Sequence, residues 1–139
     1  MGTTDAPPVA ERGPLTTITR GIVRLHAEYF GKGPTRARTE RIGGDFVICI
    51  LRDTLTPVER TLVDRGQADQ VISLRRSFQD VMAPEFPSVV ENSVGRRVLA
   101  FLSQVHLEPD IAVEMFFLEN SAVTRPGGGG RDGAGPDTS

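Results

Sequence analysis

Two short polar segments of this 139-residue chain carry the side chains from which a binding or catalytic site could be built. Residues 31–38 read GKGPTRAR, and residues 106–110 read HLEPD. Lysine and arginine bind carboxylates and phosphates, whereas imidazole and carboxylate groups bind metal ions or transfer protons. The first segment therefore suggests an anion site, and the second suggests a metal site or part of a hydrolase triad.

The basic side chains of the first segment, Lys32, Arg36 and Arg38, form the candidate anion site. The same pattern also fits the solvated face of an edge strand whose arginines pair with acids on a neighbouring strand, and this interpretation is the more general one. A phosphate-binding loop requires Gly-Lys-Ser/Thr between a strand and a helix. Here Gly33 follows Lys32, and the segment leaves the C-terminal end of a predicted helix, which has the wrong partial charge for phosphate. We therefore expect no nucleotide site.

The second segment places His106, Glu108 and Asp110 close together in the chain. A zinc site needs three or four ligands at supporting spacings, and the other histidine, His26, lies on the apolar face of a predicted helix. A hydrolase triad with Ser103 is disfavoured, because Ser103 and His106 point to opposite faces of a regular strand. We expect His106 to end a strand and the residues after it to form a turn.

These arguments leave no catalytic residue, no metal and no cofactor among our predictions, so we expect a protein that is not an enzyme. One hypothetical ligand-binding set remains, consisting of Lys32, Arg36, Arg38 and His106. The single cysteine, Cys49, lies in an apolar run, where a cysteine usually packs as a small hydrophobic side chain. We expect it to be buried and inert.

The elements that would position these residues follow from the spacing of apolar side chains. Helical spacing predicts helices over about 17–30, 56–66 and 67–94. Alternating or continuous apolar runs predict strands over about 35–42, 45–51, 96–105 and 111–119. Pro84 should break or kink the last helix, and a second helical segment that includes Phe86 should continue beyond it and end before Gly95. Gly43 and Gly44 suit a two-residue hairpin turn, and Pro109 shapes the second connection.

Two local patterns sharpen the predicted helices. Thr56 can cap the second helix, Pro57 suits its first position, and Glu59 completes a capping box. On the helix that follows, we expect the side chains of Arg75 and Arg76 to be exposed.

Hairpins pair antiparallel, so the element order α-β-β-α-α-β-β predicts an α+β fold with a four-stranded antiparallel sheet and helices packed on one face. The strand over 45–51 is apolar on both faces, which is typical of a central strand. Several apolar residues remain for the face that the helices leave open. Such a patch usually indicates a partner, and a second copy of the chain is the simplest one. We therefore expect a homodimer.

Composition limits the other partners and the extent of the domain. The net charge is −2 and no aromatic residue interleaves the arginines, so we expect no nucleic-acid partner. We find no signal-peptide pattern and no apolar run near the ~20 residues that span a bilayer, so we expect a cytoplasmic protein without membrane insertion. Composition also predicts one domain over 14–119, between a disordered tail at 1–13 and a disordered Gly-rich tail at 120–139.

Several short motifs occur in an order that resembles one bacterial family. They are IVRLH at 22–26, GKGPTRAR at 31–38, LTPVER at 55–60, GRRV at 95–98 and HLEPD at 106–110. This set is similar to the MpsC-like family, small proteins named after a sodium-translocating, membrane-potential-generating system. The resemblance covers about residues 15–119 and implies an accessory role in ion translocation. Because a chain without a membrane span cannot form an ion path, the implied role is peripheral.

The leading hypothesis is thus a non-enzymatic, soluble interaction module that docks on a membrane-protein partner. The alternative is a regulatory domain that senses a small anion through Lys32, Arg36 and Arg38. A metal-dependent enzyme built on the acidic residues beside His106 is the third and weakest hypothesis.

Overall fold

A computed structural model describes residues 13–120, in which the chain forms four helices and four strands. The helices are α1 (Pro14–Phe30), α2 (Pro57–Asp64), α3 (Ala68–Met82) and α4 (Glu85–Val94). The strands are β1 (Arg36–Ile42), β2 (Phe46–Arg52), β3 (Val98–His106) and β4 (Ile111–Leu118). Apart from residues 13 and 120, the two predicted tails lie outside the described residues.

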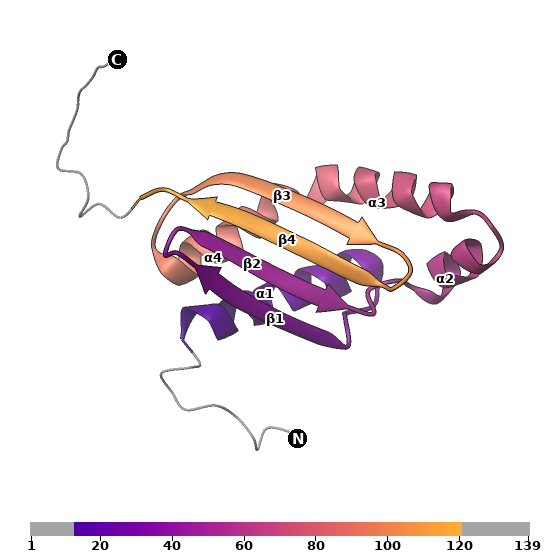
Figure 1. Cartoon of the computed structure of the whole chain (residues 1–139), viewed down its shortest axis with the longest axis horizontal. Helices are drawn as coiled ribbons and strands as arrows, with labels where there is room; N and C mark the ends of the chain where they lie inside the picture. Colours follow the sequence, from indigo (N-terminus) through magenta and orange to yellow (C-terminus); the bar gives the residue numbers. More distant parts are fainter. Residues whose placement is uncertain (1–12, 121–139) are drawn as a thin grey trace, which may run out of the picture.

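The strands form one antiparallel sheet in the order β1-β2-β4-β3 (Figure 1). Each hairpin supplies one edge strand and one central strand. The seam between the hairpins is the pairing of β2 with β4, in which Phe46 lies opposite Phe117 and Arg52 lies opposite Ile111. The predicted α+β class and four-stranded antiparallel sheet are confirmed.

Helices α1 and α4 lie against one face of the sheet, which we call the inner face, whereas α2 and α3 lie towards the end where β2 and β3 finish (Figure 1). The largest fully buried side chains of the core include Ile18, Ile22, Leu51, Phe86 and Phe116. The two packed helices approach closely at one point. A Cβ atom at Gly21 of α1 would lie 2.6 Å from Cγ1 of Val89 on α4.

The predicted break at Pro84 is confirmed, because Pro84 separates α3 from α4. Counted as separate helices, the two segments give the order α-β-β-α-α-α-β-β, which has one helix more than the predicted order. Proline lacks an N–H and its ring crowds the preceding turn, so a new helix begins there. The first hairpin turn has three residues, 43–45, because Ile42 pairs with Phe46. Gly43 and Gly44 have φ values of 66° and 87°, which glycine adopts without strain.

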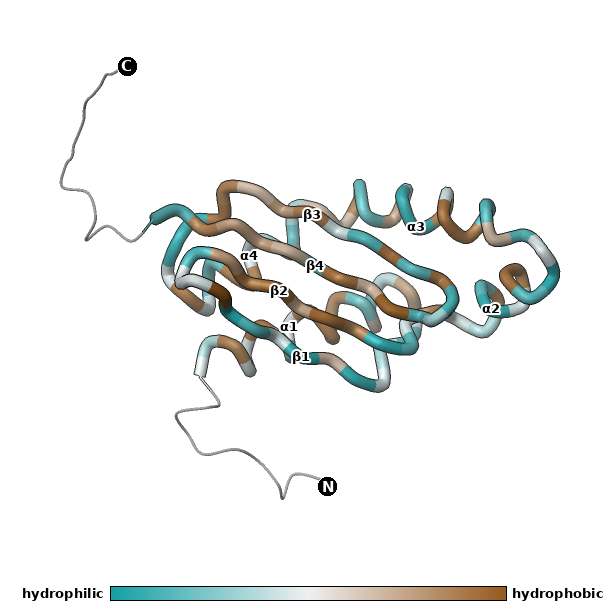
Figure 2. Tube along the Cα trace, in the orientation of Figure 1, coloured by the Kyte–Doolittle hydropathy of each residue, from teal (hydrophilic) through white to brown (hydrophobic). Residues whose placement is uncertain are grey.

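The other face of the sheet, the outer face, carries no helix among the described elements (Figure 1). Its apolar residues alternate with the buried ones along the strands and include Ile42, Phe46, Ile48, Ile50, Ala100, Leu102, Ile111, Val113, Met115 and Phe117. Ile42, Leu102 and Phe117 are 56%, 47% and 44% exposed. The apolar colour in Figure 2 follows β2 and β4, whereas β1 is largely hydrophilic.

No helix between residues 13 and 120 combines the length and the apolar character that crossing a membrane requires.

Candidate functional site

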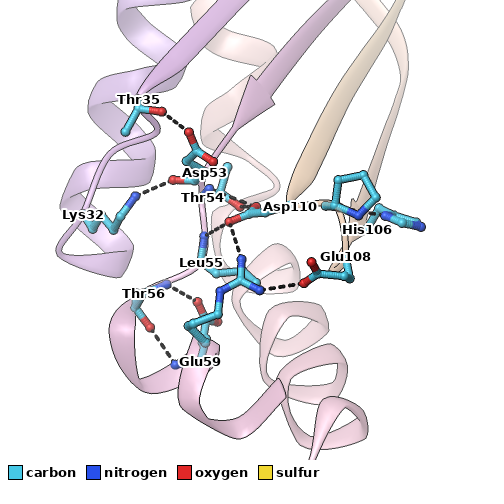
Figure 3. A network of polar contacts seen from close by, with 12 residues as sticks. Lys32, Thr35, Asp53, Thr54, Leu55, Thr56, Glu59, His106, Glu108 and Asp110 are labelled. Carbon is cyan, nitrogen blue, oxygen red and sulfur yellow. Dashed lines mark hydrogen bonds and ion pairs between the residues drawn. The ribbon is translucent and has the colours of Figure 1, made fainter. Parts of the chain in front are cut away.

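Three loops meet at the end of the sheet where β2 and β3 finish, and a carboxylate joins two of them (Figure 3). Oδ1 of Asp110 accepts hydrogen bonds from the N–H and hydroxyl of Thr54, at 3.0 and 3.1 Å, and Oδ2 accepts from the N–H of Leu55 at 2.9 Å. Arg60 on α2 lies 3.5 Å from Asp110 and 2.8 Å from Glu108. Because both oxygens of Asp110 are engaged, this residue fixes the β2–α2 loop to the second hairpin.

A buried ion pair anchors the start of α2. Arg75 Nε donates to Glu59 Oε2 at 2.8 Å, and its Nη2 donates to Oε1 at 2.5 Å and to the carbonyl of Thr54 at 2.8 Å. The guanidinium also lies 3.9 Å from the ring centre of Phe30. Glu59 and Thr56 form the reciprocal bonds of the predicted capping box, which is confirmed. The prediction that Arg75 is exposed is wrong, because only 2% of its surface reaches solvent.

The environment of Glu59 stabilises its ionised form. Burial alone would raise the pKa of this carboxyl group. The hydrogen bonds from Arg75 and from the backbone of Thr56, with the charge of Arg75, outweigh burial, so the pKa of Glu59 lies below its usual value. The ionised Glu59 carboxylate thus balances the positive charge of the buried Arg75 guanidinium.

The first polar segment is fastened to the same end of β2 (Figure 3). Lys32 Nζ donates to the carbonyl of Gly33 at 3.2 Å and to the carbonyl of Asp53. The hydroxyl of Thr35 donates to the Asp53 carboxylate. Asp53 has a φ of 60°, a left-handed conformation that is uncommon for a residue with a side chain. Lys32 therefore closes a loop and is not aimed at solvent as a free cation.

The structure does not bring the hypothetical set of four ligand-binding residues together. Arg36 and Arg38 lie on the outer face of β1, where Arg38 forms an ion pair with Glu40. His106 lies on β3, and its Nδ1 donates to the carbonyl of Pro109 at 2.8 Å. Two strands separate β3 from β1, which places His106 roughly 14 Å from Arg36 at the usual strand spacing.

A residue that the sequence prediction missed lies beside Arg36. Arg52 is directly opposite Arg36 across the β1–β2 pair, and both side chains are exposed. Neither guanidinium has a hydrogen-bond or ion-pair partner within residues 13–120. Both line a groove of about 570 Å³, together with Thr35, Ala37, Arg38 and Ile50. A two-residue turn at 43–44 would have placed Leu51 opposite Arg36. The observed turn has one residue more, which shifts the register by one and places Arg52 there.

Two polar side chains, His26 and Glu114, form a pair inside the core. His26 Nε2 and Glu114 Oε2 are 3.2 Å apart, and the two residues are 3% and 2% exposed. His26 Nδ1 and Glu114 Oε1 have no hydrogen-bond partner in the described part of the chain. The rings of Phe30 and Phe86 lie 5.6 and 5.7 Å from the His26 ring, centre to centre. A substrate cannot reach this pair without unfolding the core.

Cys49 lies opposite Glu114 on the neighbouring strand and is fully buried, as the sequence predicts. Burial raises the pKa of the Cys49 thiol to about 11, the hydrogen bond with Thr39 opposes this shift, and the charge of Glu114 adds to it. A buried, protonated thiol is a poor nucleophile. Within residues 13–120, no group of three histidine, cysteine or acidic side chains is arranged to hold a metal ion.

Comparison with known proteins gives two matches. A family model described as Na+-translocating membrane potential-generating system (MpsC) matches residues 15–120. The uncharacterized protein YrhF of Bacillus subtilis (strain 168) is 25% identical over 100 residues, which cover 70% of this chain and 81% of that protein. No solved structure matches the chain. The family match includes both polar segments and the whole sheet.

Proposed function

We propose a function from the premise that the chain belongs to the MpsC family. It is a non-enzymatic accessory module that binds a membrane-protein component of a potential-generating system through the outer face of its sheet. The family description supplies the kind of system. The uncovered apolar face is the observation that carries the proposal.

The outer face has the composition of a binding surface. Its central residues Ile48, Val113 and Met115 lie close together on β2 and β4 and are only partly covered. Complete burial of an exposed apolar side chain contributes about 1.5–3 kcal/mol, and burying the part of these side chains that is still exposed would contribute a fraction of that each. Contiguous apolar patches on soluble domains mark interaction sites. At one corner, Arg36 and Arg52 supply positive charge that would select a partner with acidic groups.

Site-specific photo-crosslinking in cells tests this function. A photoreactive phenylalanine analogue at position 115, in the centre of the outer face, should capture a membrane protein. The same analogue at position 58 is the matched control, because Val58 on α2 is also apolar and is 70% exposed. The substitution Met115→Lys should then prevent copurification of the captured protein while leaving the melting temperature close to that of the unchanged protein.

Two results would contradict the proposal. One is the same set of crosslinked products from positions 58 and 115. The other is unchanged copurification of the captured protein with the Met115→Lys variant.

One observation favours a second candidate function, the sensing of a small anion. Like charges directly opposite each other destabilise a sheet, and Arg36 faces Arg52 with no acid between them. A phosphate or carboxylate bound in the adjoining groove would relieve this repulsion. The site then comprises Arg36, Arg52 and Arg38, without Lys32 and His106, which are hydrogen-bonded elsewhere.

Calorimetric titration with inorganic phosphate and with a dicarboxylate tests the second candidate. The substitutions Arg36→Ala and Arg52→Ala should each weaken any binding by about 10- to 150-fold, since a charged hydrogen bond contributes about 1.5–3 kcal/mol. Arg41→Ala is the matched control, because Arg41 is exposed on the same strand but points to the other face. Equal affinity in all three variants would exclude this site.

A further inference from the structure

The free edge of β1 is a surface that the proposed function does not use. β1 pairs with β2 on one side only, so half of its backbone N–H and C=O groups point away from the sheet. A groove of about 980 Å³ follows that edge and is lined by β1 from Ala37 to Arg41 and by the start of α1. Among the described residues 13–120, no strand pairs with this edge, so the edge is open along most of the strand.

An unprotected edge is commonly blocked by charged side chains, and β1 carries four charges in seven residues. The order of these charges also makes the strand complementary to a second copy of itself, as the possible registers show. When two copies of a strand pair antiparallel about a two-fold axis perpendicular to the sheet, opposed residues lie on the same face. One residue of β1 must then lie directly opposite its own copy, and the axis passes midway between these two residues, which is meant below by an axis at that residue.

Thr39 lies at the middle of β1, between the opposite charges of Arg38 and Glu40, and this arrangement makes the strand self-complementary. With the axis at Thr39, all seven residues are paired, and Arg38 of each copy lies opposite Glu40 of the other. With the axis at Arg38, Glu40 faces Arg36 of the other copy, but two arginines oppose each other at the centre, and Arg41 and Ile42 have no strand residue opposite. With the axis at Glu40, two glutamates oppose each other. Like charges in direct opposition destabilise a sheet, and opposite charges stabilise it.

We propose that two copies of this chain associate through antiparallel pairing of β1 with β1 about Thr39, forming a continuous eight-stranded sheet held in register by Arg38 and Glu40. Within one copy these two side chains pair with each other, and they are 75% and 43% exposed, so a partner can reach both and exchange the pairing. Because the two-fold axis is perpendicular to the sheet, both outer faces lie on the same side. The dimer leaves the surface of the proposed function free, so the two proposals stand or fall separately.

Charge exchange tests this interface by analytical ultracentrifugation. The unchanged protein should sediment as a dimer of 15.1 kDa chains. Arg38→Glu should be monomeric, because the introduced carboxylate would face Glu40 of the other copy. Glu40→Arg should be monomeric as well, because the introduced guanidinium would face Arg38 of the other copy. An equimolar mixture of these two variants should recover the dimer, since positions 38 and 40 then carry opposite charges wherever they face each other.

Met115→Lys is the control for the interface, because it changes the outer face alone and should leave the dimer intact. A monomeric unchanged protein, a mixture that stays monomeric, or loss of the dimer in Met115→Lys would overturn the proposal.

Disulfide trapping gives a second, independent readout if a charge variant folds poorly. One copy carrying Arg38→Cys and another carrying Glu40→Cys should form a mixed disulfide under mild oxidation, because directly opposed strand residues meet the required Cα spacing. Arg41→Cys with Glu40→Cys is the control, since Arg41 points to the other face. Equal trapping in both mixtures would also contradict the interface.

Discussion

At the scale of single residues, the ion pair between Glu59 and Arg75 is the most consequential contact outside the apolar core. Glu59→Gln should lower the free energy of unfolding by about 3 kcal/mol, because it leaves the buried Arg75 charge without a counter-ion. Glutamine still fits the capping box, so Thr56→Ala, which removes the cap alone, is the control and should cost about 1 kcal/mol. Urea unfolding measures both. Equal losses in the two variants would show that the charge contributes nothing.

The same pair gives a pH dependence with a defined sign. The pKa of Glu59 is lower in the folded protein than in the unfolded chain. Its stabilising contribution is therefore fully present above the unfolded value near 4.5 and is lost as the pH falls through the folded value. Acid unfolding of Glu59→Gln should lack this component, so the stability difference from the unchanged protein should shrink below about pH 4.

Cys49 should act at the other end of the pH scale. The folded pKa of about 11 exceeds the unfolded value near 9, so the folded thiol keeps its proton while the unfolded thiol loses it. Stability should fall between about pH 9 and 11 by roughly 2–3 kcal/mol, and Cys49→Ala should remove that part of the decline. Urea unfolding at pH 8 and at pH 11 measures the difference. A decline of the same size in Cys49→Ala would assign it to other groups.

At this scale, contacts between residues that are close in the chain can be predicted from the sequence, whereas contacts between distant segments cannot. The capping box is predictable because Thr56 and Glu59 are three residues apart and form it within one turn. The burial of Arg75 is not, because its partners Glu59 and Thr54 come from sequence positions that only the fold brings near. A charged side chain is expected at the surface unless its partner is known.

At the scale of elements, Gly21 sets the distance between α1 and α4. Alanine normally stabilises a helix interior by about 1 kcal/mol over glycine. Here its Cβ would lie 2.6 Å from Val89, so Gly21→Ala should instead destabilise the protein by about 1–2 kcal/mol. In a Val89→Ala background the same change should be tolerated. Thermal unfolding of the four-protein cycle measures this coupling, and strictly additive effects would disprove the contact.

Element types and their approximate limits follow from periodicity, whereas connections are less certain. The strands, the helix start at Pro57 and the helix break at Pro84 each have a local steric or hydrogen-bonding cause. The predicted hairpin turn is one residue too short, since two glycines fit turns of either length. That single residue shifts the register, so Arg52 instead of Leu51 lies opposite Arg36, which is why the Arg36–Arg52 pair could not be predicted.

At the scale of the whole molecule, the sequence predicts two hairpins and one sheet but not the order of the strands. Hairpin pairing is local, whereas the seam joins residues 46–52 to residues 111–118. The two-sided apolar character of β2 indicates a central position for that strand, but it does not say which strand of the other hairpin lies beside it. The convergence of the two polar segments at one end of the sheet is a consequence of this seam, because it sets Asp110 beside the end of β2.

Because the seam joins the two hairpins, the domain consists of two consecutive halves of the chain that pack against each other. α1, β1, β2 and α2 all precede the exposed Gly66, whereas α3, α4, β3 and β4 all follow it. The halves meet through β2–β4, α1–α4 and α2–α3, and the last of these contacts includes the Glu59–Arg75 ion pair. Fragments 13–66 and 67–120 should each lack ordered structure alone and regain the circular dichroism of the whole domain when mixed. Structure in either fragment by itself would contradict this expectation. In terms of assembly, the folded domain behaves as a pair of complementary subunits that one short loop keeps together.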